Sequence, residues 1–137
     1  MRLMALATTA IVSFLICAPV DARTFTLTCD VTNYGDAGST SGVESLVPRH
    51  SVHEVESSDA QIDGTSLIGT ASDVGTRIKI RYVGQLKNIG DAEVIYTYIK
   101  SSGAMVARTR GLRTIPWDEF FPERTGQYII TGRCTRS

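Results

Sequence analysis

The chain has 137 residues, 42% of them hydrophobic, and its 14 basic side chains balance its 14 acidic ones, so the formal net charge is zero. This length is typical of a single domain with one hydrophobic core. A neutral balance argues against a protein whose main task is to bind nucleic acid or an anionic membrane, because both need a net positive field.

The first 22 residues have the pattern of a secretory signal peptide. Arg2 supplies the positive charge at the start, residues 3–17 are almost entirely apolar, and a proline follows at position 19. Small residues at positions 20 and 22 match what a signal peptidase recognises. We therefore expect cleavage after Ala22.

Two alternatives to a cleaved signal are open. The first is a retained membrane anchor, for which the apolar run is about as short as a bilayer span allows and lacks a basic stop. The second is lipidation of Cys17, but the residue before it, Ile16, is larger than a lipoprotein signal prefers. We expect a secreted or periplasmic protein whose mature part, residues 23–137, is one domain without a membrane span.

The period of the apolar residues is two along most of the mature chain, which is typical of strands. Strict alternation predicts a strand at residues 24–31. Residues 34–75 are less regular. Within them, the glycines and serines of 35–42 indicate a flexible loop, and short strands are expected at 51–56 and near 62–68.

The second half of the mature chain repeats the strand pattern more clearly. Residues 77–83 alternate, and residues 93–100 are rich in β-branched and aromatic residues on both faces, which suits a central strand. A short hairpin loop at 101–103 is expected to lead into a strand at 104–110. The inward side chains expected for the first of these strands are Ile78, Ile80 and Tyr82.

A turn at 123–126 is followed by a last predicted strand at 127–134. Once the signal is removed, Cys29 and Cys134 are the two remaining cysteines, and both lie on the apolar face of their strands. An oxidising compartment would join them, closing a loop of about 100 residues that contributes roughly 4–5 kcal/mol of stability. The sequence therefore predicts an all-β fold, a small antiparallel barrel or sandwich closed by a disulfide between its first and last strands.

The two histidines, His50 and His53, are followed by Glu54 and Glu56. On a helix the histidine pair would share a face and could hold zinc. On the expected strand, however, the two rings would point to opposite faces. We expect solvated surface histidines, with neither a metal nor a cofactor.

Ser66 lies in a glycine-flanked segment, residues 64–69, that is one residue longer than the nucleophile elbow of a serine hydrolase. A serine triad would also need His50 or His53 as its base. Catalysis by a small hydrolase is therefore the third of the functions considered, behind two forms of binding.

Two rows of basic residues could bind an anionic partner. They are Arg77, Lys79 and Arg81 in one predicted strand and Arg108, Arg110 and Arg113 in or just after another. If the two strands are neighbours, the rows could merge into one patch. The alternative is that they are simply charged faces turned to water, which also discourage edge-to-edge pairing.

Residues 115–122 hold an unusual group of aromatic side chains between two prolines. They are Trp117, Phe120 and Phe121. One interpretation is that these rings close one end of the core. The other is a protein-binding loop, supported by Arg108, Arg110 and Arg113, because aromatic residues and arginine dominate interface hot spots.

The first and last strands carry a resemblance. The motif Phe25-Thr26-Leu27-Thr28-Cys29, with residues 123–128 and 131–134 near the other end, is similar to the ends of small exported proteobacterial proteins of unknown function. Ser101–Ser102–Gly103–Ala104 also resembles the inhibitory loop of periplasmic lysozyme inhibitors, which are small antiparallel barrels. The chain departs from the inhibitors in lacking the aromatic residue after that loop and their paired basic motif.

These observations predict a non-catalytic exported domain that binds a protein or cell-envelope component. An inhibitor of a secreted hydrolase such as lysozyme is the alternative.

Overall fold

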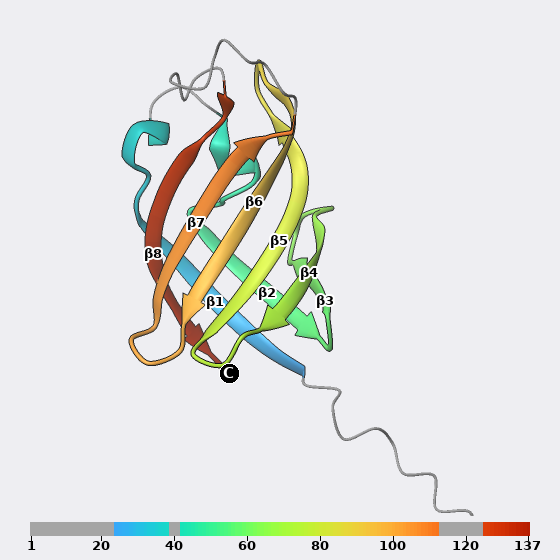
Figure 1. Cartoon of the computed structure of the whole chain (residues 1–137), viewed down its shortest axis with the longest axis vertical. Helices are drawn as coiled ribbons and strands as arrows, with labels where there is room; N and C mark the ends of the chain where they lie inside the picture. The colour runs from blue at the N-terminus through green and yellow to red at the C-terminus, as the bar shows by residue number, and fades with distance from the viewer. Residues whose placement is uncertain (1–23, 39–41, 113–124) are drawn as a thin grey trace, which may run out of the picture.

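The computed structural model describes residues 24–38, 42–112 and 125–137. Within these residues the chain forms a closed barrel of eight antiparallel strands, joined in chain order (Figure 1). In that order the strands are β1 Thr24–Asn33, β2 His50–Glu56, β3 Asp59–Ile62, β4 Ile68–Asp73, β5 Arg77–Leu86, β6 Gly90–Ile99, β7 Ala104–Gly111 and β8 Tyr128–Arg136.

The barrel closes where β8 pairs with β1. Cys29 and Cys134 are direct partners in that pairing and are joined by a disulfide, with their Cα atoms 4.1 Å apart. The predicted all-β fold and its disulfide are thus confirmed, and the fold is a barrel and not a sandwich. Closure leaves no strand at an edge, so each strand is paired on both sides.

The inward side chains of the strands fill the barrel. Ile78, Ile80 and Tyr82 are almost completely buried, as their alternation predicted. On β8 the same is true of Ile130 and Cys134, which alternate with exposed residues. The core is therefore the interior of the barrel, where a period of two brings every second residue.

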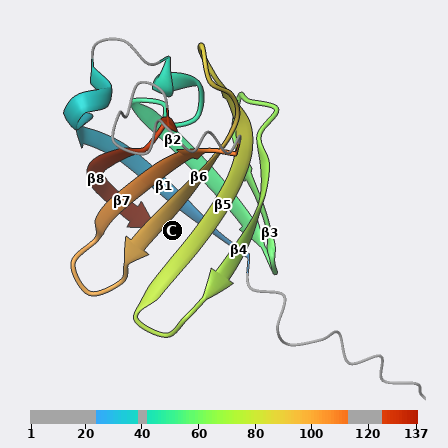
Figure 2. The same ribbon diagram turned by 45° about the horizontal axis from the view of Figure 1, so that its top comes forward.

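The connection between β1 and β2 covers one end of the barrel (Figure 2). It contains two short 3₁₀ helices, η1 Gly35–Gly38 and η2 Val43–Ser45. The glycine-rich composition predicted a flexible loop here, but Ala37 of η1 is buried, as are Leu46 and Val47 after η2. Apolar residues set among the glycines and serines thus anchor part of this connection to the core.

Of the two strands expected between residues 34 and 75, one is confirmed and one is wrong. β2 covers the predicted strand at 51–56. The strand predicted near 62–68 is instead a connection between β3, which ends at Ile62, and β4, which begins at Ile68. Gly64 has a φ of 75°, a left-handed conformation that glycine adopts without strain and that turns the chain there.

Several sequence predictions lie outside the described residues: the signal segment, the alternatives at Cys17, the aromatic segment 115–122 and the first part of the turn at 123–126. Over residues 24–38, 42–112 and 125–137, no helix is long and apolar enough to cross a membrane.

Candidate functional site

Two of the six predicted binding residues, Arg108 and Arg110, lie on the outer face of β7 and are exposed. The other four, Arg113, Trp117, Phe120 and Phe121, lie outside the described residues. The chain enters the segment that holds those four after β7 and leaves it just before β8. Arg108 and Arg110 are therefore on one of the two strands that border the segment.

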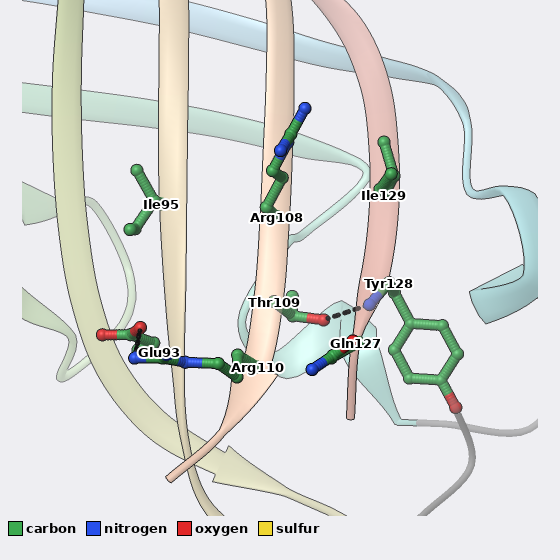
Figure 3. Close-up of a pocket in the computed structure, with 8 residues that line it drawn as sticks. All are labelled: Glu93, Ile95, Arg108, Thr109, Arg110, Gln127, Tyr128 and Ile129. Atoms are coloured by element: carbon green, nitrogen blue, oxygen red, sulfur yellow. Dashed lines mark hydrogen bonds and ion pairs between the residues drawn. The ribbon is translucent and has the colours of Figure 1, made fainter. Parts of the chain in front are cut away.

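A groove of about 490 Å³ lies on the outer face of β6, β7 and β8 (Figure 3). Its lining residues come from the three strands and from the residue before β8. They are Glu93, Ile95, Arg108, Thr109, Arg110, Gln127, Tyr128 and Ile129.

Arg108 lies between two apolar side chains in this groove. Its register partner on β6 is Ile95, and its partner on β8 is Ile129, which is 59% exposed. Within the described part of the chain, Arg108 forms no ion pair; the arginines paired with carboxylates there are Arg49, Arg81 and Arg110. An arginine with apolar neighbours on both sides and no carboxylate of its own is a composition that protein interfaces favour.

Glu93 closes one side of the groove and holds two other arginines. Its carboxylate oxygens lie 2.5 Å from Nε of Arg81 and 2.7 Å from the guanidinium of Arg110. Burial alone would raise the pKa of the Glu93 carboxyl, but the hydrogen bond from Arg81 and the charges of Arg110 and Arg81 outweigh burial and lower it. The carboxylate is therefore ionised, and its negative charge partly neutralises the positive charges of Arg81 and Arg110.

The two basic rows predicted from the sequence do not merge. β6 lies between β5, which carries Arg77, Lys79 and Arg81, and β7. Glu93 of β6 then bridges the two rows through Arg81 and Arg110, so of the two interpretations the merged anion-binding patch does not hold. The charge available for a partner in the groove is concentrated at Arg108.

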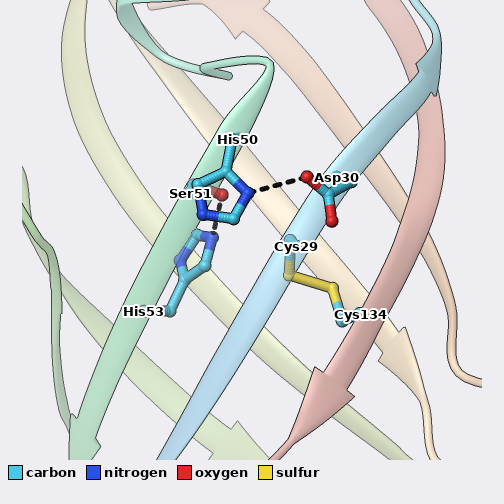
Figure 4. Close-up of polar contacts among 6 residues, drawn as sticks. All are labelled: Cys29, Asp30, His50, Ser51, His53 and Cys134. Atoms are coloured by element: carbon cyan, nitrogen blue, oxygen red, sulfur yellow. Dashed lines mark hydrogen bonds and ion pairs between the residues drawn. A yellow bond between two sulfur atoms is a disulfide. The ribbon is translucent and has the colours of Figure 1, made fainter.

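A second polar cluster lies inside the barrel (Figure 4). The ring of His53 is completely buried, with Nε2 2.8 Å from Oγ of Ser51 and Nδ1 2.8 Å from the hydroxyl of Tyr82. It also meets the ring of Tyr96 edge-on, at a centroid distance of 4.5 Å. The prediction of two solvated histidines is thus wrong for His53, because the inward positions of β2 include polar residues.

His50, by contrast, is exposed, and its Nδ1 donates to Oδ1 of Asp30 at 2.7 Å. In this respect the prediction of a solvated histidine is confirmed. The ring of His50 points outward and that of His53 points inward. This is the arrangement expected on a strand, where residues three positions apart lie on opposite faces. In the described ranges, no three His, Cys, Asp or Glu side chains are grouped as they would be around a metal ion.

Burial lowers the pKa of the His53 imidazole to about 4, so the ring is neutral at ordinary pH. A neutral imidazole has one donor and one acceptor nitrogen, which Ser51 and Tyr82 satisfy. The space beside the ring, bordered by Cys29, Tyr96 and Met105 among others, has no room for a molecule of the size of water. Ser51, His53 and Tyr82 therefore form a polar network within a filled core, and Ser66, the candidate nucleophile, is exposed and is not among the hydrogen-bond partners of His53.

The sequence did not identify Ile95 and Ile129 as site residues, although a signal was present. Ile129 occupies an outward position in a strand that otherwise alternates cleanly, and Ile95 is outward in the strand that is rich in β-branched and aromatic residues on both faces. That composition indicates a central strand. In the closed barrel one of the two faces belongs to the outer wall, where Glu93 and Ile95 line the groove.

Comparison of the chain with protein-family models, with curated proteins and with solved structures returned no match.

Proposed function

We propose that this protein is an exported, non-catalytic domain, secreted or periplasmic, that binds a protein or cell-envelope component through the groove on β6, β7 and β8. The observation that carries the proposal is the position of Arg108 between Ile95 and Ile129. The expected partner presents an acidic group beside apolar surface. Trp117, Phe120, Phe121 and Arg113 are proposed to extend the contact from the segment between β7 and β8.

Two features support export. The disulfide between Cys29 and Cys134 is of a kind that persists in oxidising compartments and is rare in the cytosol. The signal-like pattern of the first 22 residues is consistent with the same destination. Intact mass of the exported protein tests this part directly, and a mature chain beginning at Arg23 is the expected result.

Two further features support binding without catalysis. The buried histidine is hydrogen-bonded to Ser51 and Tyr82, and the space beside its ring does not admit a molecule of the size of water. The groove, in contrast, is on the surface and open to a second molecule. Exposed apolar side chains beside a charge of one sign are characteristic of interaction sites.

The test is partner capture from envelope extract with two matched variants. Ile129→Asp places a charge in the groove, whereas Val74→Asp places the same charge on an exposed apolar residue between β4 and β5, which is 55% exposed against 59% for Ile129. We expect wild type and Val74→Asp to retain the same partner and Ile129→Asp to lose it. Equal retention by all three proteins would contradict a site in this groove.

Inhibition of a secreted hydrolase is the second candidate function, because the loop between β6 and β7 is firmly held. Gly103 donates to the carbonyl of Ile99 at 2.9 Å and accepts from the backbone N–H of Cys134 at 2.8 Å. The guanidinium of Arg133 donates to the carbonyl of Ser102 at 2.8 Å. Ser101 and Ser102 are exposed on this loop, and an exposed loop fixed in one conformation loses little entropy when it enters an enzyme cleft.

Cell lysis by lysozyme provides an assay for this second candidate. An inhibitor that uses the loop should slow lysis, and Ser101→Trp should weaken inhibition at least about tenfold by changing the shape of the loop. Ser58→Trp, on the exposed turn between β2 and β3, is the matched control. Unchanged lysis in the presence of wild type would remove lysozyme as the target.

A further inference from the structure

The two halves of the barrel carry opposite charge, although the whole chain is neutral. The first four strands contain five carboxylates and no lysine or arginine. These are Asp30, Glu54, Glu56, Asp59 and Asp73. The last four strands contain seven lysines and arginines and two carboxylates. The basic residues are Arg77, Lys79, Arg81, Arg108, Arg110, Arg133 and Arg136, and the acidic ones are Asp91 and Glu93.

The strand order places these halves on opposite sides of the molecule. In a closed barrel of eight strands in sequence order, β2 and β3 lie across the barrel from β6 and β7, as Figures 1 and 2 show. β2 and β3, which carry three of the five carboxylates, therefore lie away from the groove that holds Arg108. A neutral sum of charges thus conceals a molecule with an acidic side and a basic side.

The acidic side has a groove of its own, of about 630 Å³. Glu54, Glu56 and Asp59 line it, together with Ile68, whose side chain is 74% exposed. Within the described residues, these three carboxylates form no ion pair with a lysine or arginine, since the acidic partners there are Asp30, Glu44, Asp73 and Glu93. The acidic groove thus combines unpaired negative charge with exposed apolar surface.

The basic side has the complementary composition. Arg108 is exposed there without an ion pair in the described part of the chain, and Ile129 beside it is 59% exposed. Lys79 is also exposed, on the outer face of β5, which lies at the border of the basic side, two strands from β7 and two strands from β3. Each side thus has one exposed isoleucine, and the unpaired charges beside the two isoleucines are opposite in sign.

We propose that the occupant of the groove on β6, β7 and β8 can be a second copy of this chain, which docks through the acidic groove on its β1–β4 half. Opposite charges would attract across the contact, and the zero net charge means that the copies do not repel one another as a whole. Because the two surfaces lie on different sides of the barrel, the contact is head-to-tail, and each added copy leaves one acidic and one basic side free. Self-association goes beyond the proposed function and does not depend on it. Binding of a different protein is tested separately, by capture from envelope extract.

The test uses two charge-reversed proteins made from the chain as it is exported. The first, Lys79→Glu with Arg108→Glu, removes the basic docking surface. The second, Glu54→Lys with Glu56→Lys, removes the acidic one. All four positions are exposed, so both proteins should fold like wild type, which circular dichroism and thermal melting would verify.

Sedimentation velocity at rising protein concentration should show open-ended association of wild type and at least about tenfold weaker association of each variant alone. An equimolar mixture of the two variants retains one intact acidic and one intact basic surface, so it should form a heterodimer. Because the two reversed surfaces are again opposite in charge, the heterodimer can extend into longer complexes. Raising the salt concentration from about 0.1 M to about 1 M should dissociate it, since the screening length falls from about 10 Å to about 3 Å.

Three results would overturn the proposal: wild type that stays monomeric at every concentration, variants that associate as strongly as wild type, or a mixture in which no heterodimer forms. A monomeric wild type that still captures a foreign partner through Ile129 would remove self-association and leave the proposed function intact.

Discussion

Cys29 of β1 and Cys134 of β8 are direct register partners on the two strands whose pairing closes the barrel. Their disulfide spans 105 positions of the chain, from the first strand to the last. The bond therefore holds together the seam of the barrel and restricts almost the whole unfolded domain.

The first prediction concerns this bond. Replacing both cysteines by alanine should lower the free energy of unfolding by about 4 kcal/mol, because a loop of this length loses much of its freedom in the unfolded state when it is closed. Urea unfolding of the variant and of wild type, both without reductant, measures the difference. In the presence of reductant, the free energy of unfolding of wild type should approach that of the variant. Equal midpoints with equal slopes for the three samples would show that the bond does not stabilise the fold.

The second prediction concerns pH. Above the ordinary histidine pKa of 6.5, His53 is neutral in both the folded and the unfolded protein. As the pH falls below 6.5, the unfolded chain binds a proton that the folded protein, with its pKa lowered to about 4, does not. The stability should therefore decrease with falling pH, by about 3 kcal/mol at pH 4 and below.

Denaturant unfolding between pH 7 and pH 5 isolates this contribution from that of most carboxyl groups. His53→Gln keeps a donor and an acceptor for Ser51 and Tyr82 and should flatten the pH dependence. His50→Gln, at the exposed histidine, is the control for removing a titrating ring. If the free energy of unfolding of His53→Gln depended on pH as strongly as that of wild type, the pH dependence would have to come from other groups.

The third prediction concerns Trp117, which we propose as a contact residue. Trp117→Ala should change the free energy of unfolding by no more than about 0.5 kcal/mol, as substitutions at exposed positions usually do. It should also weaken partner capture at least about tenfold. If the tryptophan belonged to the core, the same substitution would cost about 3–5 kcal/mol of stability, so a thermal melt separates the two interpretations.

The sequence predicted best those strands in which apolar and polar residues alternate without interruption. In β5, Ile78, Ile80 and Tyr82 alternate with charged residues, and inward and outward positions can be read directly. The disulfide was predictable because Cys29 and Cys134 fall on the apolar faces of the terminal strands. Residues 62–68 were misassigned because Ile62, Leu67 and Ile68 supply apolar side chains on either side of a turn, and composition alone does not locate that turn.

The candidate site was predictable only in part, for two physical reasons. Polar Ser51 and His53 occupy inward positions of β2, which conceals the alternation there, and only the fold shows that Tyr82 satisfies the ring. The charge separation was hidden because net charge is a sum over the chain. It becomes visible when the strand order assigns Glu54 and Arg108 to opposite sides of the barrel.

Arg108, which has no ion pair within the described residues, is the residue on which binding in the groove should depend most. The direct measurement is the dissociation constant of the captured partner for wild type, for Arg108→Glu and for Lys87→Glu, which makes the same change of charge at an exposed position after β5. We expect Arg108→Glu to raise the dissociation constant at least about tenfold and Lys87→Glu to change it by less than about threefold. Equal effects of the two substitutions, or no effect of either, would contradict the assignment of the groove as the binding site.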